Sequence, residues 1–104
     1  DGNQRRQLLY VDDFINIIED TKDKFNNDII NISDNKDCSI KEYAKIICDI
    51  FDYDYGLIKY DNTKYVGMKE NKIVNSKIEY DFTDIRDGLK KTADYYVNLF
   101  NKKM

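Results

Sequence analysis

Two adjacent arginines near the start of the chain, Arg5 and Arg6, are the side chains best suited to chemistry. They precede a short apolar run at residues 8–10 and an acidic helix start at Asp12 and Asp13. Guanidinium groups form forked, charge-assisted hydrogen bonds to phosphate, and the end of a strand holds such a side chain better than a loose loop does. The segment therefore predicts a phosphate contact at a strand-to-helix junction. The alternative is a solvated basic turn, because most arginine pairs are simply surface charge.

The apolar pattern predicts about three helices and several short strands. Helices are expected at about residues 12–24, from the cap residue Ser39 to before Gly56, and after a cap at Thr83. Ser39 and Glu42 form an S-x-x-E capping box. Strands are expected at residues 8–10, 29–32 and 57–60, with 72–74 extended. The expected inward faces are Val11, Phe14, Ile15, Ile18 and Phe25; Ile40, Tyr43, Ala44, Ile47 and Phe51; and Ile85, Leu89, Ala93, Tyr96, Val97 and Phe100.

Length and composition fit one small domain that spans residues 1–104. The chain has 104 residues with 41% hydrophobic content, enough for a single modest core. A formal net charge of -3 argues against a general nucleic-acid binder, which would present a clustered basic face. No stretch approaches the ~20 apolar residues that cross a bilayer, so no membrane partner is expected and the cytoplasm is the default compartment.

Metal chemistry has little support in the sequence. Cys38 and Cys48 are the two cysteines, without C-x-x-C spacing, and the chain contains no histidine. Cys48 is expected to be a small buried hydrophobic residue. Asp12 and Asp13 could form a metal pair, but acidic residues in a first helical turn are the ordinary complement to the helix dipole.

Four segments, in order, resemble motifs of extended short-chain dehydrogenases that act on nucleotide sugars, the NAD-dependent epimerase/dehydratase family. Residues 4–13 (QRRQLLYVDD) are similar to R-R-x-[FL]-[IL]-[HY]-V-D-D, and residues 31–42 (NISDNKDCSIKE) to N-[IV]-G-[ST]-G-x-x-x-[ST]-I-x-E. Residues 60–69 (YDNTKYVGMK) resemble a D-T-S-K-P-D-G-[MT] loop, and residues 84–89 (DIRDGL) resemble the S-L-x-x-G-[LI] that opens the last helix. The loop at 60–69 points within the family to the GDP-L-fucose synthases.

The resemblance implies an α/β fold, here a small α+β-like domain that corresponds to the C-terminal substrate domain without its Rossmann domain. The four glycines do not form the Gly-rich turn that a dinucleotide site needs, and the chain begins at Asp1 instead of Met. We therefore expect the C-terminal part of a longer enzyme, inactive by itself, with NADP or NAD bound elsewhere in the parent. The family's reaction would be epimerisation of GDP-4-keto-6-deoxymannose followed by reduction by NADPH.

Carried over residue by residue, the resemblance implies a binding site for a nucleotide diphosphate sugar, with a GDP-sugar favoured, and no catalytic residue in this chain. Arg6 matches the arginine that contacts the diphosphate, and Lys72 matches the lysine after the family's D-G turn. Lys64 and Gly67 belong to the same loop and are expected to contact substrate. Enzymes of this family commonly form dimers, so a homodimer of the parent enzyme is an open expectation.

Departures from the family's pattern leave the sugar open. Val66 stands where the family has an aspartate that contacts the sugar nucleotide, Tyr65 replaces the preceding proline, and no G-W-x-P segment lies between Ile78 and Thr83. The alternatives are another nucleotide-sugar 4-epimerase or 4,6-dehydratase, or a binding module that is not an enzyme.

Tyr60 and Lys64 have the Tyr-x-x-x-Lys spacing of the catalytic pair of short-chain dehydrogenases. In those enzymes a helical turn lets the ammonium lower the pKa of the phenol. Here the pair is expected to run from a strand into a loop, where the two side chains need not meet. We therefore expect Tyr60 and Lys64 to serve the loop, not to catalyse proton transfer.

Overall fold

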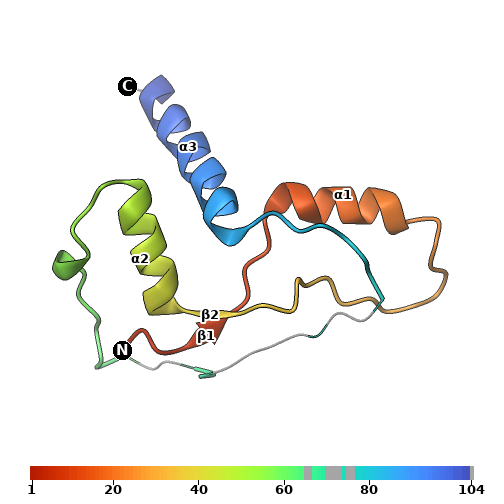
Figure 1. Ribbon diagram of the computed structural model, residues 1–104, viewed down its shortest axis with the longest axis horizontal. Coiled ribbons are helices and arrows are strands. Elements are labelled where there is room, and N and C mark those ends of the chain that lie inside the picture. The colour runs from red at the N-terminus through yellow and green to blue at the C-terminus, as the bar shows by residue number, and fades with distance from the viewer. Residues whose placement is uncertain (65–66, 70–73, 75–76, 104) are drawn as a thin grey trace.

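The computed structural model describes residues 1–64, 67–69, 74 and 77–103. Within these residues the fold has three helices, one 3-10 turn and one antiparallel pair of strands (Figure 1). In chain order they are β1 (Arg5–Arg6), α1 (Val11–Thr21), β2 (Cys38–Ser39), α2 (Ile40–Ile50), η1 (Tyr55–Leu57) and α3 (Ile85–Lys103). The prediction of a small mixed α/β domain with about three helices is confirmed.

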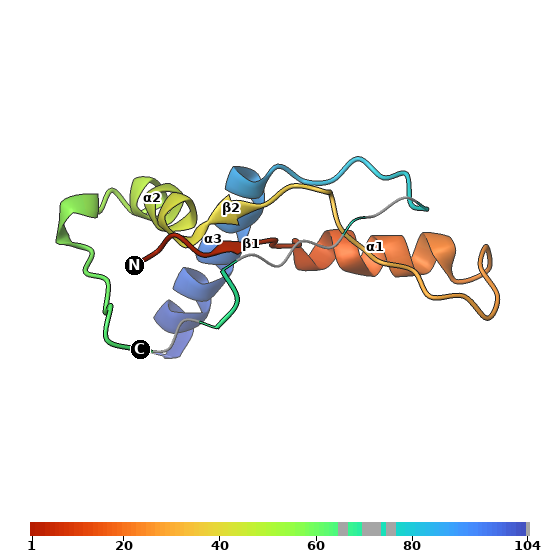
Figure 2. The same ribbon diagram turned by 90° about the horizontal axis from the view of Figure 1, so that it is seen from below.

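Strand β1 lies at the centre of the fold, between α2 and α1 (Figure 2). Its register places Arg5 opposite Ser39 and Arg6 opposite Cys38. The pairing continues beyond the two strands, because Ile40 N donates to the Gln4 carbonyl at 2.9 Å. On the other side of β1, Arg5 N donates to the carbonyl of Lys69 at 2.7 Å. Segments from three distant parts of the sequence are therefore held at β1.

The predicted strands at residues 8–10, 29–32 and 57–60 are wrong. All three segments are irregular, except that η1 overlaps the start of the last one. The β-branched and apolar runs lack a neighbouring strand within the described part of the chain, whereas the polar residues Arg5 and Arg6 have one. Lys72 and Ile73, in the segment predicted to be extended, lie outside the described residues.

Helix α2 starts where the capping box predicts. The Ser39 hydroxyl accepts a hydrogen bond from Glu42 N at 3.1 Å, which satisfies one of the amides left free at a helix start. The inner face consists of Tyr43 and Cys48, so the prediction that Cys48 is buried is confirmed. The expectation of an inward face that includes Ile40, Ile47 and Phe51 is wrong, because these three side chains are exposed.

Helix α1 turns a different face inward from the one predicted. Ile17 is 1% exposed and Asp13 is 4% exposed, one helical turn apart. The expected core residues Val11, Phe14, Ile15 and Ile18 are exposed, and the helix ends at Thr21 instead of residue 24. The physical reason is that α1 lies along one end of the molecule (Figure 1), where its side with Asp13 and Ile17 is covered while Val11, Phe14, Ile15 and Ile18 stay exposed.

Asp13 ties the start of α1 to the segment that leads into α3. Its carboxylate accepts from Thr83 N at 2.9 Å and from the Thr83 hydroxyl at 2.8 Å. The Tyr80 hydroxyl donates to the same carboxylate at 3.4 Å. We call this set of contacts the Asp13 clamp. The predicted Thr83 cap is therefore wrong: Asp84 accepts from Arg86 N at 3.1 Å, while the Thr83 hydroxyl is directed to Asp13.

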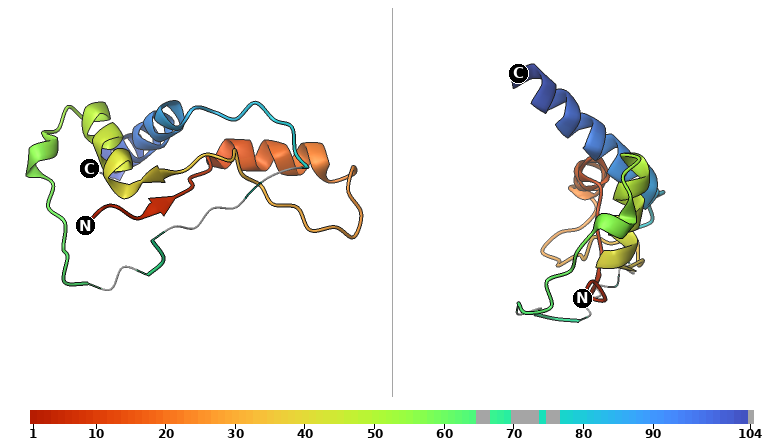
Figure 3. Two further views of the ribbon diagram at one scale, coloured as in Figure 1. Left: turned by 60° about the horizontal axis from the view of Figure 1, so that its bottom comes forward. Right: turned by 90° about the vertical axis from the view of Figure 1, so that its left-hand side faces the viewer.

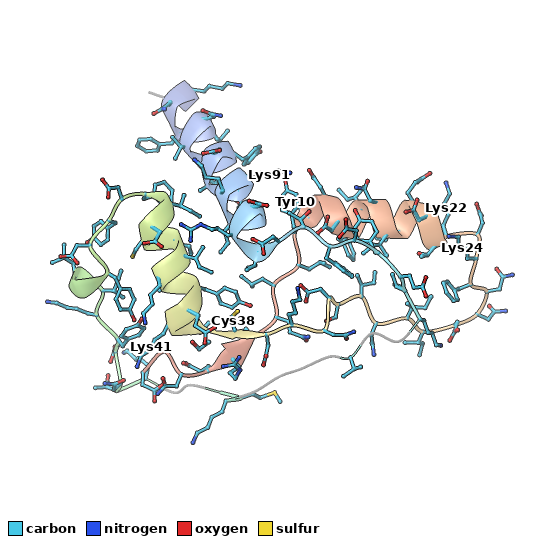
Figure 4. All side chains as sticks on the ribbon, viewed as in Figure 1. Tyr10, Lys22, Lys24, Cys38, Lys41 and Lys91 are labelled. Atoms are coloured by element: carbon cyan, nitrogen blue, oxygen red, sulfur yellow. The ribbon has the colours of Figure 1, made fainter. Side chains whose placement is uncertain are left out.

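A second contact packs the start of α3 on the residue before α1. A methyl group added at Gly88 would lie 3.4 Å from the Tyr10 side chain, so the helix backbone approaches the ring closely. The Lys91 ammonium lies 5.6 Å from the centroid of the same ring, a cation–π distance (Figure 4). The first half of α3 is thus fixed against Tyr10 and the Asp13 clamp.

The second half of α3 extends away from the other helices (Figure 3). The expectation that Tyr96, Val97 and Phe100 face inward is wrong, since all three are exposed, Phe100 to 63%. The radius of gyration is 16.5 Å, against about 13 Å for a compact chain of this length. The accessible surface of 8294 Å² likewise exceeds the roughly 6,100 Å² typical of a compact monomer of this mass.

Among the described residues, none of the helices has the length and apolar character needed to cross a membrane.

We predict that Asp13→Asn lowers the free energy of unfolding by about 1–3 kcal/mol, because the amide keeps the size of the carboxylate but cannot accept both Thr83 hydrogen bonds. Denaturant unfolding measures the effect. Asp12→Asn is the matched control, since Asp12 is exposed, and we expect a change within about 0.5 kcal/mol. Equal effects of the two substitutions would contradict the role of the Asp13 clamp.

Candidate functional site

Among the described residues, the groups that hold the Arg6 guanidinium are backbone oxygens and not carboxylates. Its Nη1 donates to the Arg5 carbonyl and its Nη2 to the Met68 carbonyl, each at 2.7 Å. A guanidinium carries five N–H donors, so these two bonds leave donors for a ligand. Within the described residues no carboxylate lies at ion-pair distance from Arg6. Its direction is therefore fixed while its charge is left unneutralised in this part of the chain.

Arg5 is, by contrast, already paired. Its Nε lies 3.0 Å from Asp37 Oδ2, and its Nη2 donates to Asp37 Oδ1 at 3.3 Å and to the Asp37 carbonyl at 3.2 Å. Glu42 Oε1 lies 3.8 Å from Arg5 Nη1. The hydrogen bond to Asp37, followed by its charge, raises the pKa of Arg5 above its ordinary value. Arg5 thus ties β1 to the segment before β2.

The difference between the two arginines follows from strand geometry. Successive side chains of a strand point to opposite faces, so Arg5 and Arg6 cannot reach the same partner. Arg5 faces Asp37, whereas Arg6 faces the chain around Met68. An arginine pair on one short strand therefore divides into one structural side chain and one side chain suited to bind an anion.

The backbone of Arg6 is fixed from α2. The Tyr43 hydroxyl donates to the Arg6 carbonyl at 2.6 Å, and Tyr43 is 7% exposed. Burial raises the pKa of Tyr43 to about 12, with the charge of Cys38 acting in the same direction. The phenol therefore keeps its proton, and its ability to donate, at neutral pH.

The structure brings the loop after Gly67 to Arg6. Gly67 has φ +78°, a left-handed conformation that side chains rarely adopt, and a Cβ built there would meet nothing within 4 Å. The next two residues supply carbonyls to β1, Met68 to the Arg6 side chain and Lys69 to Arg5 N. Of the predicted site residues, Arg6 and Gly67 are thus brought into one region.

The other predicted loop residues are not brought to Arg6 by any contact in the described part of the chain. Lys64 is exposed and follows a turn in which Asp61 accepts from Thr63 N at 2.9 Å and from the Thr63 hydroxyl. Lys72, Tyr65 and Val66 lie outside the described residues. Their predicted roles at the substrate stay predictions.

Tyr60 has a structural environment. Its hydroxyl lies 2.8 Å from the hydroxyl of Tyr55, and this hydrogen bond is the first cause that raises the pKa of Tyr60 to about 12. Its ring packs on Gly2, where an added Cβ would come within 2.5 Å of Tyr60 Cε1, and the Lys41 ammonium lies 5.7 Å from the ring centroid (Figure 4). A phenol that transfers protons near neutral pH needs a lowered pKa, the opposite of what is found.

Both cysteines are free thiols. Cys38 lies opposite Arg6 on β2 (Figure 4), and burial, followed by Glu42, raises the pKa of its thiol. It is therefore no anionic partner for Arg6 at neutral pH. The described residues contain no group of three or more histidine, cysteine or acidic side chains that could hold a metal ion.

A small pocket lies between the residues that follow β1 and the start of α3. It has a volume of about 200 Å³, and its lining includes Leu8, Tyr10, Phe82 and Leu89. Pockets that enclose a drug-sized ligand usually measure about 300–1,000 Å³. This pocket is therefore too small to enclose a ligand as large as a nucleotide sugar.

Sequence reasoning missed the groups that hold Arg6. The apolar pattern predicts only that Tyr43 faces inward. A tyrosine also carries a hydroxyl, which needs a hydrogen-bond partner when the side chain is buried. The carbonyls of Arg5 and Met68 have no signature in residue types. Asp37 carries a charge opposite to that of Arg5, but only the register of β1 with β2 shows that they meet.

A comparison with curated proteins finds similarity to the GDP-L-colitose synthase of Yersinia pseudotuberculosis. The two are 34% identical over 104 residues, covering 94% of this chain and 33% of the relative. The chain thus spans about a third of the length of this curated relative. No protein-family model matches the chain, and no solved structure matches it. The similarity supports a relationship to extended short-chain dehydrogenase-like enzymes, without singling out the GDP-L-fucose synthases.

We predict that Tyr43 makes folding stability fall at high pH. Its pKa is raised from 10.0 to about 12 in the folded state, so the neutral phenol is favoured by folding. This contribution is complete below about pH 10 and is lost as the pH rises toward 12. Between pH 9 and pH 11 the loss is roughly 1 kcal/mol. Denaturant unfolding at both pH values measures it.

Tyr43→Phe is the control for this pH dependence. Its free energy of unfolding should fall by roughly 1 kcal/mol less than that of the wild type over the same interval. The same fall in both proteins would show that the Tyr43 hydroxyl is not the group responsible.

Proposed function

We propose that this chain binds the diphosphate of a nucleotide sugar through Arg6, with GDP-sugars as the favoured class. The observation that carries the proposal is the contrast between the two arginines of β1. Arg5 is neutralised by Asp37, whereas Arg6 is held in place by two carbonyls and keeps its charge among the described residues. A fixed guanidinium with free donors is suited to phosphate oxygens.

The relative supports the choice of ligand. Its name, GDP-L-colitose synthase, states that it makes a GDP-linked sugar, and the similarity extends over 94% of this chain. The four sequence segments resemble enzymes that act on the same class of compound. The class of ligand is therefore supported by the sequence motifs and by the relative's name, whereas the choice of Arg6 rests on the motif at residues 4–13 and on its contacts.

In a parent enzyme like the GDP-L-fucose synthases, this part would orient the substrate. Epimerisation of a 4-keto sugar and its reduction by NADPH would use acid–base groups and a cofactor held outside these residues. Holding the diphosphate fixes the distance between the sugar carbon and the hydride donor, and such positioning can contribute several kcal/mol to a barrier. The 104 residues by themselves are proposed to bind without catalysing.

The residues present do not fit a dinucleotide cofactor. A phosphate cradle needs glycines whose missing Cβ lets backbone approach the ligand. The space beside Gly2 is taken by Tyr60 and Lys41, that beside Gly56 by Asp54 and that beside Gly88 by Tyr10, whereas Gly67 has open space but no second glycine near it in the sequence to complete a Gly-rich turn. NADP or NAD is therefore a proposal for a parent enzyme only.

The loop residues extend the proposed site. Lys64 and Lys72 would add positive charge near the diphosphate, and Gly67 would let backbone amides approach the ligand. A homodimer of the parent and a location in the cytoplasm remain proposals that accompany this assignment.

We predict that GDP-L-fucose and GDP-mannose bind the full 104-residue chain and that Arg6→Ala weakens binding about 10- to 100-fold, because each charge-assisted hydrogen bond contributes about 1.5–3 kcal/mol. A chemical-shift titration followed by NMR measures the dissociation constants. Arg86→Ala is the matched control, because it removes an exposed arginine of α3 that lies 3.5 Å from Asp49, and it should leave binding unchanged.

A panel of UDP-, CDP- and dTDP-sugars separates the alternatives. Tighter binding of one of these would favour a 4-epimerase or 4,6-dehydratase for that nucleotide while keeping the role of Arg6. If the folded chain binds none of the compounds, or if Arg6→Ala binds as tightly as the wild type, the proposal is wrong and a binding module of another kind takes its place.

A further inference from the structure

We propose that Tyr43 is the positioning residue of the phosphate site: by holding the Arg6 carbonyl, its hydroxyl sets the direction of the Arg6 guanidinium. The inference rests on the proposed function of Arg6. Tyr43 would affect ligand binding without touching the ligand, because it would act only through Arg6.

The contact links two elements that are each fixed by other interactions. Tyr43 lies in the first turn of α2, whose start is capped by Ser39 and paired to β1 through Ile40 N and the Gln4 carbonyl. From there the phenol reaches the Arg6 carbonyl at 2.6 Å, a short hydrogen bond between partly buried groups. The hydroxyl is thus anchored independently of the arginine that it orients.

Arg6 is the residue at which such an anchor is needed. β1 ends at Arg6, and the chain then leaves the sheet toward α1. Without the Tyr43 hydroxyl, the Arg6 carbonyl would lack its hydrogen-bond donor on α2. A rotation of roughly 10° at Cα displaces a guanidinium roughly 6 Å away by about 1 Å, and a misplacement of that size can remove most of the benefit of an oriented group.

The chemistry of the phenol suits a permanent donor. Tyr43 is buried, so water does not compete for the Arg6 carbonyl, and its raised pKa keeps the proton in place. Leu8 and Cys38 line the same small cavity as Tyr43. The hydroxyl therefore lies where β2 and the residues on both sides of Gln7 converge, which is the position from which the exit of β1 can be fixed.

A double-mutant cycle tests the inference with GDP as the probe. The four proteins are the wild type, Tyr43→Phe, Arg6→Ala and the double variant, each as the full 104-residue chain. We expect Tyr43→Phe to weaken GDP binding about 5- to 10-fold in the wild-type background and to have no further effect in the Arg6→Ala background, because its influence passes through Arg6. Dissociation constants come from NMR titrations.

Tyr55→Phe is the matched control. It removes a phenolic hydroxyl that is hydrogen-bonded to Tyr60 instead of Arg6, and GDP binding should not change. Should Tyr43→Phe reduce the folded fraction, the titrations are repeated in trimethylamine N-oxide, an osmolyte that favours the folded state. A purely structural role would then leave the affinity of the refolded variant equal to that of the wild type.

The outcomes separate the two proposals. If Arg6→Ala weakens GDP binding but Tyr43→Phe does not, or if Tyr43→Phe weakens it equally in both backgrounds, the positioning role is wrong and the phosphate site stands. If the wild type does not bind GDP, or if Arg6→Ala has no effect, the proposed function and the positioning role are both overturned.

Discussion

The backbone hydrogen bonds of β1 are the interaction on which the rest of the arrangement depends. On one side, the carbonyls of Gly2 and Gln4 accept from Lys41 and Ile40; on the other, Arg5 N donates to the Lys69 carbonyl. The N-terminal segment, the start of α2 and the loop after Gly67 therefore meet along residues 2–5. Because a strand alternates its side chains, the same pairing that closes the fold also directs the two arginines to opposite faces. Among the described residues, one guanidinium is then paired with a carboxylate and the other is not.

Outside β1, polar contacts stabilise much of the fold, because the apolar core is small. The buried apolar side chains among the described residues are those of Ile17, Tyr43 and Cys48. Between them, the Asp13 clamp joins α1 to the segment before α3, and the Tyr43 hydroxyl joins α2 to β1. Buried polar groups stabilise a fold only when their partners are all present, so each of these contacts is more sensitive to substitution than an exposed apolar residue of α3.

Local signals in the sequence predicted local features of the structure. The capping box at Ser39, the existence of three helices and the burial of Cys48 depend on residues close together in the chain, and they were found. Strands and buried faces depend on partners far away: the apolar run at residues 8–10 has no strand beside it, while Arg5 and Arg6 do. The face of α1 was mispredicted because apolar residues cover more of that helix than the rest of the chain can bury. For the candidate site, Arg6 could be singled out by type, whereas the carbonyl of Met68 could not, because a backbone oxygen is the same in every residue.

As the proposed phosphate contact, Arg6 would be better suited to orienting a ligand than to binding it tightly. Hydrogen bonds to one guanidinium contribute about 1.5–3 kcal/mol each, whereas micromolar affinity corresponds to about 8 kcal/mol. The pocket between the residues after β1 and the start of α3, at about 200 Å³, is too small to enclose the base and the sugar of such a ligand. What the surroundings of Arg6 provide instead is a fixed direction, since two carbonyls hold its side chain and one phenol holds its backbone. Reaction rates respond to orientation as strongly as to affinity, and a diphosphate held in one direction is useful to an enzyme even when its binding is weak.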